Sequence, residues 1–125
     1  MTADPETGDR VINIRRPYLH LIREGRKTTE VRVGYASMRK ITPGQVLRFA
    51  CEDEFVRTRV TAVCEYPSFE AMLDSEDNAA IGAAGMTRDD LLAACRDIYP
   101  PEKEALGVLA IHLAPIQADA GQRRR

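Results

Sequence analysis

Five short segments rich in apolar and β-branched residues recur along this chain of 125 residues, and they limit the folds that it can adopt. Each is bounded by glycine, proline or charged turn residues and has the length and composition of a β-strand. The expected strands are residues 11–14, 28–33, 46–51, 55–65 and 107–113. With helices in the connections, five such strands predict an α+β fold built on a small, partly open β-barrel.

An amphipathic segment after the first expected strand predicts a helix. Pro17 suits the first helical turn, where the missing N–H costs nothing. Tyr18, Leu21 and Ile22 fall at positions i, i+3 and i+4 and therefore share one side of the helix. Gly25 is placed to end this helix in a left-handed cap.

Two more amphipathic segments follow the fourth expected strand. Ser68 is the expected N-cap of the first, and residues 87–90 resemble a capping box for the second. Pro100 and Pro101 stop the second helix. Residues 74–86, which lie between the two, are acidic or small and predict a loop or a weak helix. The side chains expected to be buried are Phe69, Met72, Leu73, Leu91, Leu92, Cys95 and Ile98.

Because side chains alternate along a strand, each expected strand divides its residues between two faces. Leu47, Phe49 and Cys51 share one face of the third strand. The fourth strand has Arg57 and Arg59 on one face, where they meet either solvent or a nucleic acid. Its other face carries Val56, Val60, Ala62 and Cys64.

The length predicts one domain over residues 10–114, between polar tails at residues 1–9 and 115–125. A hydrophobic fraction of 44% is enough for a buried core. The polar, acidic N-terminus does not resemble a signal peptide, and no apolar run is long enough to span a bilayer. We therefore expect a cytoplasmic protein with no membrane partner.

The net charge of −1 hides an uneven distribution. Residues 10–50 contain ten basic and two acidic residues, whereas residues 51–104 contain five basic and thirteen acidic residues. Either the molecule has one basic face, or the two segments interleave in space and their charges cancel.

The cysteines and histidines do not follow a metal-binding spacing. Cys51, Cys64 and Cys95 are far apart in sequence, and the two histidines are His20 and His112. No Cys-x-x-Cys pair occurs, and a zinc site usually has more closely spaced ligands. We expect reduced, buried cysteines, no bound metal and no cofactor.

Residues 25–32 bring a lysine, a glutamate and two arginines to the junction between the first helix and the second strand. In an extended chain Thr28, Glu30 and Arg32 share one face, with Lys27 at its entrance. This arrangement suits a site for a polar ligand at a place where backbone groups are free. The alternative is a solvated edge strand with a local ion pair.

The same residues carry a resemblance. The run Gly25-Arg26-Lys27-Thr28-Thr29-Glu30-Val31-Arg32 resembles the Gly-x-Lys-x-x-Glu-x-Arg signature of the ASCH domain family. Further segments that resemble this family, in the right order, are residues 43–49, 60–69, 98–100 and 107–111. The resemblance covers roughly residues 10–114. It implies a PUA-like barrel and RNA or a nucleotide as the partner.

A binding site of this kind needs few groups. Lys27 and Arg32 can meet a phosphate or a base carbonyl, and Glu30 can accept from an amino group or a ribose hydroxyl. Single-stranded RNA is read through splayed bases and aromatic stacking. The further candidate ligand-binding residues are Arg26, Thr28, Tyr35, Tyr66 and Tyr99.

The resemblance also permits catalysis. One branch of the family hydrolyses N4-acetylcytidine with a lysine, which matches Lys27, a threonine and a glutamate. Glu30 occupies the threonine position here, and the glutamate falls near Ala84. Lys27 and Glu30 are then the candidate catalytic residues, although their pairing makes Glu30 a weaker base.

Ribonuclease activity is a second enzymatic possibility, because some ASCH proteins cleave single-stranded RNA. His20 is the candidate acid or base. His112 is more simply a core histidine whose ring nitrogens have hydrogen-bond partners. A third hypothesis is that the acidic second half binds a protein partner. No oligomeric state follows from the sequence. We favour binding of RNA or a nucleotide over hydrolysis, and hydrolysis over the partner-binding module.

Overall fold

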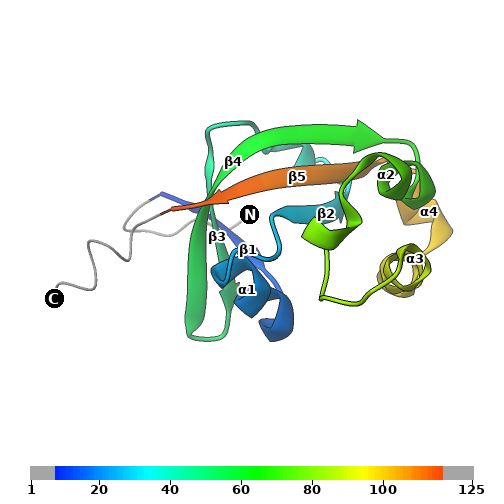
Figure 1. Cartoon of the computed structure of the whole chain (residues 1–125). Coiled ribbons are helices and arrows are strands. Elements are labelled where there is room, and N and C mark those ends of the chain that lie inside the picture. Colours follow the sequence, from blue (N-terminus) through cyan, green and yellow to red (C-terminus); the bar gives the residue numbers. More distant parts are fainter. Residues whose placement is uncertain (1–7, 117–125) are drawn as a thin grey trace, which may run out of the picture.

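The computed structural model describes residues 8–116, and the predicted tails fall mostly outside this range. The elements, in chain order, are β1 (Arg10–Asn13), α1 (Arg16–Arg23), β2 (Thr29–Val33), η1 (Met38–Lys40), β3 (Val46–Cys51), β4 (Glu54–Tyr66), α2 (Phe69–Ser75), η2 (Asn78–Ala80), α3 (Arg88–Ile98), α4 (Pro101–Glu104) and β5 (Val108–Pro115) (Figure 1).

The five strands form one sheet in the order β1-β3-β4-β5-β2. β1 lies parallel to β3, and every other neighbouring pair is antiparallel. The edge strands β1 and β2 are joined by a hydrogen bond of 3.0 Å from Arg32 Nη2 to the carbonyl oxygen of Asn13. The predicted α+β fold, a partly open barrel of five strands with helices in the connections, is therefore confirmed.

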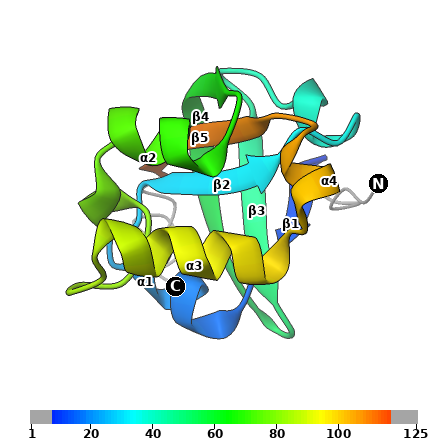
Figure 2. The ribbon, with the colours of Figure 1, turned by 90° about the vertical axis from the view of Figure 1, so that its right-hand side faces the viewer.

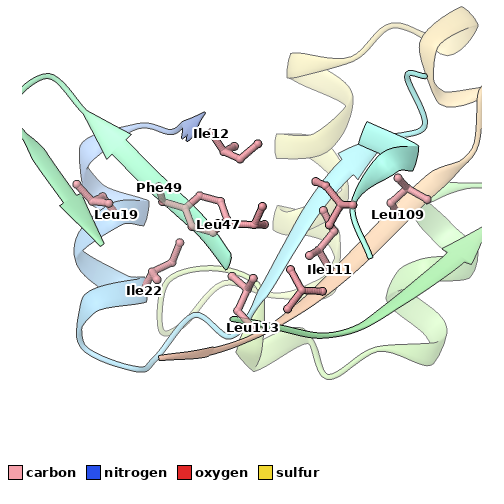
Figure 3. Packing of buried hydrophobic residues seen from close by; sticks show 10 residues of the cluster. Ile12, Leu19, Ile22, Leu47, Phe49, Leu109, Ile111 and Leu113 are labelled. Carbon is pink, nitrogen blue, oxygen red and sulfur yellow. The ribbon is translucent and has the colours of Figure 1, made fainter. Parts of the chain in front are cut away.

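A first hydrophobic core fills the curved inside of the sheet. Side chains from β1, α1 and β3 point toward those of β5, as Figure 3 shows. Leu19, Leu47 and Phe49 are completely buried here. The predicted inward face of the third strand is thus confirmed for Leu47 and Phe49, while Cys51 is only partly buried beside them.

A second core lies on the other face of β5, under α2 and α3. Val108 and Ala110 belong to this core, whereas the alternate residues Leu109 and Ile111 belong to the first. Because both faces of β5 are buried, its sequence reads as a continuous apolar run rather than an alternating one.

The alternation predicted for the fourth strand is wrong beyond residue 60. The β4–β5 register shifts between Val60 and Ala62, which marks a β-bulge. The extra residue reverses the faces, so Val60 and Val63 pack in the first core while Cys64 packs in the second. A one-residue insertion has this effect because side chains alternate with a period of two.

The predicted helix ends are largely confirmed. The Ser68 side chain accepts a hydrogen bond from the Ala71 N–H, and Thr87 and Asp90 form a reciprocal capping box. Gly25 ends α1 with φ of 80°, a conformation that glycine adopts without strain. Pro101 does more than stop α3, because it starts the short helix α4.

Two other expectations need correction. Ile98 is 51% exposed rather than buried, because it lies at the last turn of α3. Asp9, which we assigned to the N-terminal tail, is buried and accepts from Arg57 Nε at 2.6 Å. Arg59 is exposed to solvent, which is one of its two predicted environments, and donates to the carbonyl of Gly44. None of the helices between residues 8 and 116 has the length and apolar content needed to cross a bilayer.

The first core generates a stability prediction. Leu47→Ala removes a completely buried side chain and should lower the free energy of unfolding by about 2–5 kcal/mol. Leu106→Ala, the same substitution at a residue that is 43% exposed, should have little effect. Urea denaturation measures both variants, and equal losses would contradict the core assignment.

Candidate functional site

A cavity of about 560 Å³ opens where the first core, β2 and α3 meet. Its walls come from β1 and the turn after it, from α1, from β2, from residues 81 and 82, and from α3. Figure 2 shows α3 running along β2 on this side of the molecule. The volume is within the range of small-molecule and nucleotide sites.

Three charged side chains of the predicted motif line one wall of this cavity. Lys27 Nζ lies 3.1 Å from Glu30 Oε1, and Arg32 Nε lies 2.5 Å from Glu30 Oε2. The side chains of Lys27 and Glu30 are only 5% and 8% exposed. The face that we predicted for Glu30 and Arg32 is therefore directed at the cavity, and these side chains of the edge strand β2 are largely shielded from solvent.

Lys27 also connects two parts of the chain. Its ammonium donates to the carbonyl oxygens of Thr29, at 2.9 Å, and of Ile81, at 2.6 Å. The backbone N–H of Thr28 donates to the carbonyl of Ala80 nearby. The loop before α3 is thus fastened to the start of β2, and Lys27 contributes to the fold as well as to the cavity.

The electrostatics of this wall keep Glu30 ionised. Burial on its own would raise the pKa of Glu30, but the positive charges of Lys27 and Arg32, with their hydrogen bonds, hold that pKa below its ordinary value. A carboxylate with a lowered pKa is a good hydrogen-bond acceptor and a weak general base at neutral pH.

The other walls are aromatic or apolar. Tyr18 and Tyr99 line the cavity, and the Tyr18 ring lies 5.5 Å from Lys27 Nζ. Burial raises the pKa of the Cys95 thiol to about 11, so Cys95 remains protonated and presents an apolar surface. Burial also raises the pKa of Tyr99. A flat ring fits such a lining better than an extended polar chain does.

Four predicted site residues do not line the cavity. Arg26 is exposed and pairs with Glu24 at 3.6 Å. Thr28 is half-buried beside the cavity wall. Tyr35 is exposed, with Lys103 Nζ 5.5 Å from its ring. Tyr66 donates to Glu76 on a different part of the sheet, because the bulge in β4 turns it there.

The residues weighed for catalysis are also separated from the cavity. His20 lies 3.0 Å from Glu54 and His112 lies 2.7 Å from Glu76, and neither lines the cavity. Ala84 is exposed in the loop before α3. Glu30 is the one carboxylate among the described residues that line the cavity.

Sequence reasoning missed much of the lining. Tyr18 was placed only on one side of the first helix, Leu91 and Cys95 were assigned only to the core, and Ile98 was expected to be buried with them. One signal was present, because the apolar stripe of α3 extends to Ile98 at the very end of the helix. Nothing in the sequence indicates that Lys27 reaches the carbonyl of Ile81, 54 residues away.

The basic and acidic halves of the sequence interleave to a large extent. Arg16 and Arg23 pair with Glu54, and Arg39 pairs with Glu65. These pairs cancel charge locally rather than create one basic face. Arg15, at the cavity, is exposed and has no ion-pair partner within residues 8–116.

Comparison with known proteins agrees with this architecture. The family model of the ASCH domain matches residues 12–117. The crystal structure of hypothetical protein PH0355 is similar over 86% of this chain and 99% of its own, with 27% identity and a TM-score of 0.79. The solution NMR structure of protein PF0455 from Pyrococcus furiosus covers 86% of this chain and 97% of its own, with 28% identity and a TM-score of 0.72. No curated protein matches.

The buried charges generate a prediction about stability. Glu30→Gln leaves Lys27 and Arg32 without a counter-charge and should lower the free energy of unfolding by about 3 kcal/mol at pH 7. The pKa of Glu30 is lowered on folding, so its stabilising effect exists above the ordinary value of 4.5 and is lost as the pH falls further. The difference between wild type and variant should therefore shrink below about pH 4.5.

Urea denaturation at several pH values measures this difference. The control is Glu24→Gln, which breaks an exposed pair and should change stability little at any pH. A Glu30→Gln variant as stable as wild type at pH 7 would contradict the role given to the buried charges.

Proposed function

Since this chain belongs to the ASCH domain family, whose fold is PUA-like, we propose that it binds RNA or a nucleotide in the cavity around Lys27, Glu30 and Arg32. Family membership suggests RNA binding in general. The specific site rests on one observation: a fixed carboxylate and two cations form one wall of a cavity whose other walls are aromatic and apolar.

The wall offers both kinds of hydrogen-bonding group. Glu30 uses one oxygen for Lys27 and the other for Arg32, and each carboxylate oxygen has a further lone pair for an amino or hydroxyl donor. Arg32 donates through Nε and Nη2 to protein acceptors, which leaves Nη1 for a base carbonyl or a phosphate. Such groups can read the edge of a single base.

The aromatic residues and Arg15 support the same ligand. Tyr18 and Tyr99 line the cavity with aromatic surface, and stacking of a base on such a ring is worth about 1–3 kcal/mol per base. Arg15, exposed and without an ion-pair partner among residues 8–116, is suited to a phosphate at the mouth of the cavity. A ligand with its base inside the cavity and its phosphate at Arg15 is a nucleotide, such as one residue of single-stranded RNA.

Binding is better supported than hydrolysis. Lys27 is engaged with two backbone carbonyls as well as with Glu30, and the lowered pKa of Glu30 makes it a poor proton acceptor. Hydrolysis of an amide or of RNA needs a base and an acid beside the scissile bond. The histidines lie outside this cavity lining.

A substitution at the cavity mouth tests the site without removing its buried charges. Ile98→Glu introduces a negative charge at an exposed lining residue and should weaken binding of labelled single-stranded RNA at least about tenfold, through repulsion of phosphate. Leu106→Glu places the same charge at an exposed leucine outside the cavity and should leave affinity unchanged.

The same reactions should be followed for products of RNA cleavage, and parallel reactions for hydrolysis of N4-acetylcytidine. Binding without product, weakened by Ile98→Glu alone, is the expected result. Product that is lost in Glu30→Gln, with that variant folded, would establish an enzyme instead. If Ile98→Glu and Leu106→Glu bound single-stranded RNA with equal affinity, the RNA would not bind in this cavity.

The salt dependence of RNA binding tests the phosphate contact. Arg15→Gln should reduce the slope of log K against log salt by about 0.7, the value for one phosphate on a single strand. Lys40→Gln, at an exposed residue outside the cavity lining, should leave the slope unchanged. Equal slopes in wild type and Arg15→Gln would show that Arg15 contacts no phosphate.

A further inference from the structure

Three metal-ligand side chains meet at a second place in the fold. Cys64 comes from β4, Glu76 from the C-cap of α2 and His112 from β5. One donor atom of each lies within 4.8 Å of the other two. Cys64 and His112 project from neighbouring antiparallel strands, where the register pairs Cys64 with Ala110 and Ala62 with His112. They are therefore diagonal neighbours on one face of the sheet.

The cluster is already held together by hydrogen bonds. Glu76 Oε1 lies 2.7 Å from His112 Nε2, and the Tyr66 hydroxyl donates to Glu76 Oε2 at 2.5 Å. The Glu76 side chain is 7% exposed and that of His112 is 36% exposed. Glu76 is thus buried and oriented, while the histidine side of the cluster remains open to water.

We propose that Cys64, Glu76 and His112 bind one Zn²⁺ ion. A thiolate, an imidazole and a carboxylate are the three kinds of protein ligand that zinc uses, and a thiolate makes Mg²⁺ or Ca²⁺ a poor fit. Three protein ligands with a solvent-accessible side leave the fourth tetrahedral position to a water molecule.

The geometry needs only a small adjustment. Zinc–ligand bonds of about 2.0–2.3 Å at tetrahedral angles place donor atoms roughly 3.3–3.6 Å apart. The donor atoms of the cluster are already within 4.8 Å, and the Glu76–His112 pair, at 2.7 Å, needs to open by roughly 0.6 Å or more.

The surroundings stabilise the carboxylate ligand. The backbone N–H of Glu76 donates to Met72, and Asn78 Nδ2 donates to the carbonyls of Leu73 and Glu76. Tyr66 occupies Glu76 Oε2 and leaves Oε1 for the metal. An outer hydrogen bond of this kind orients a metal ligand and is typically worth a factor of about 10–100 in affinity.

This site is separate from the proposed nucleotide cavity, because none of its three ligands lines that cavity. The wide spacing of its ligands along the chain explains why the sequence predicts no metal site. The ligands stand at positions 64, 76 and 112, and only the pairing of β4 with β5 and the packing of α2 against both strands bring them together (Figure 1).

Zinc titration of the purified protein of 125 residues tests the proposal. After removal of metal by a chelator, the wild type should bind one Zn²⁺ per chain by calorimetry. Co²⁺ in its place should give a thiolate-to-cobalt charge-transfer band. Cys64→Ser should abolish that band, and both Cys64→Ser and His112→Gln should weaken Zn²⁺ binding by a factor on the order of 100. Tyr66→Phe, which keeps all three ligands, should weaken it about tenfold.

The matched control is Cys95→Ser, which removes another partly buried cysteine away from the cluster and should bind Zn²⁺ as the wild type does. Circular dichroism verifies folding, and if Cys64→Ser is unfolded, His112→Gln decides the question. A wild type that binds no Zn²⁺ would overturn the proposal. Equal Zn²⁺ affinities of wild type and His112→Gln would also overturn it, because the three side chains would then form a hydrogen-bonded cluster that does not bind the metal.

Discussion

The buried contact between Glu30 and the cations Lys27 and Arg32 is the interaction on which the open side of the barrel, between the edge strands β1 and β2, depends. Through Lys27 it fastens the loop before α3 to β2, and through Arg32 it joins β2 to the end of β1. Two edge strands that share no ladder are thereby held at a fixed separation. The cost of burying these charges is offset only because each has several partners, which makes the arrangement specific rather than merely stabilising.

Most of the architecture follows from local patterns, and the candidate site follows from them only in part. Glu30 and Arg32 were expected on one face because they are two residues apart in a strand, and that relation needs no tertiary information. The side of the sheet on which Cys64 lies was predicted wrongly because a bulge cannot be read from alternation alone. The contact between Lys27 and Ile81 joins segments whose pairing is decided by packing of the second core, so no local pattern predicts it.

The two cores also explain why a cavity exists at all. β5 contributes alternate residues to both cores, and α1 packs in the first core while α2 and α3 pack in the second. α1 and α3 therefore belong to different cores and do not fill the space between them. The proposed nucleotide site lies in this junction, where Ile98 remains exposed at the end of α3.

The bulge in β4 gives the strand a property that its composition does not reveal. Thr61 is the residue skipped in the pairing with β5, and it is exposed. Every later side chain of β4 owes its side of the sheet to this one extra position. Because of this position, Val60 before the bulge and Val63 after it both face the first core, while Cys64 and Tyr66 face the second. Deletion of Thr61, with every other residue kept, would place each later side chain of β4 on the opposite face of the sheet and so in the opposite core.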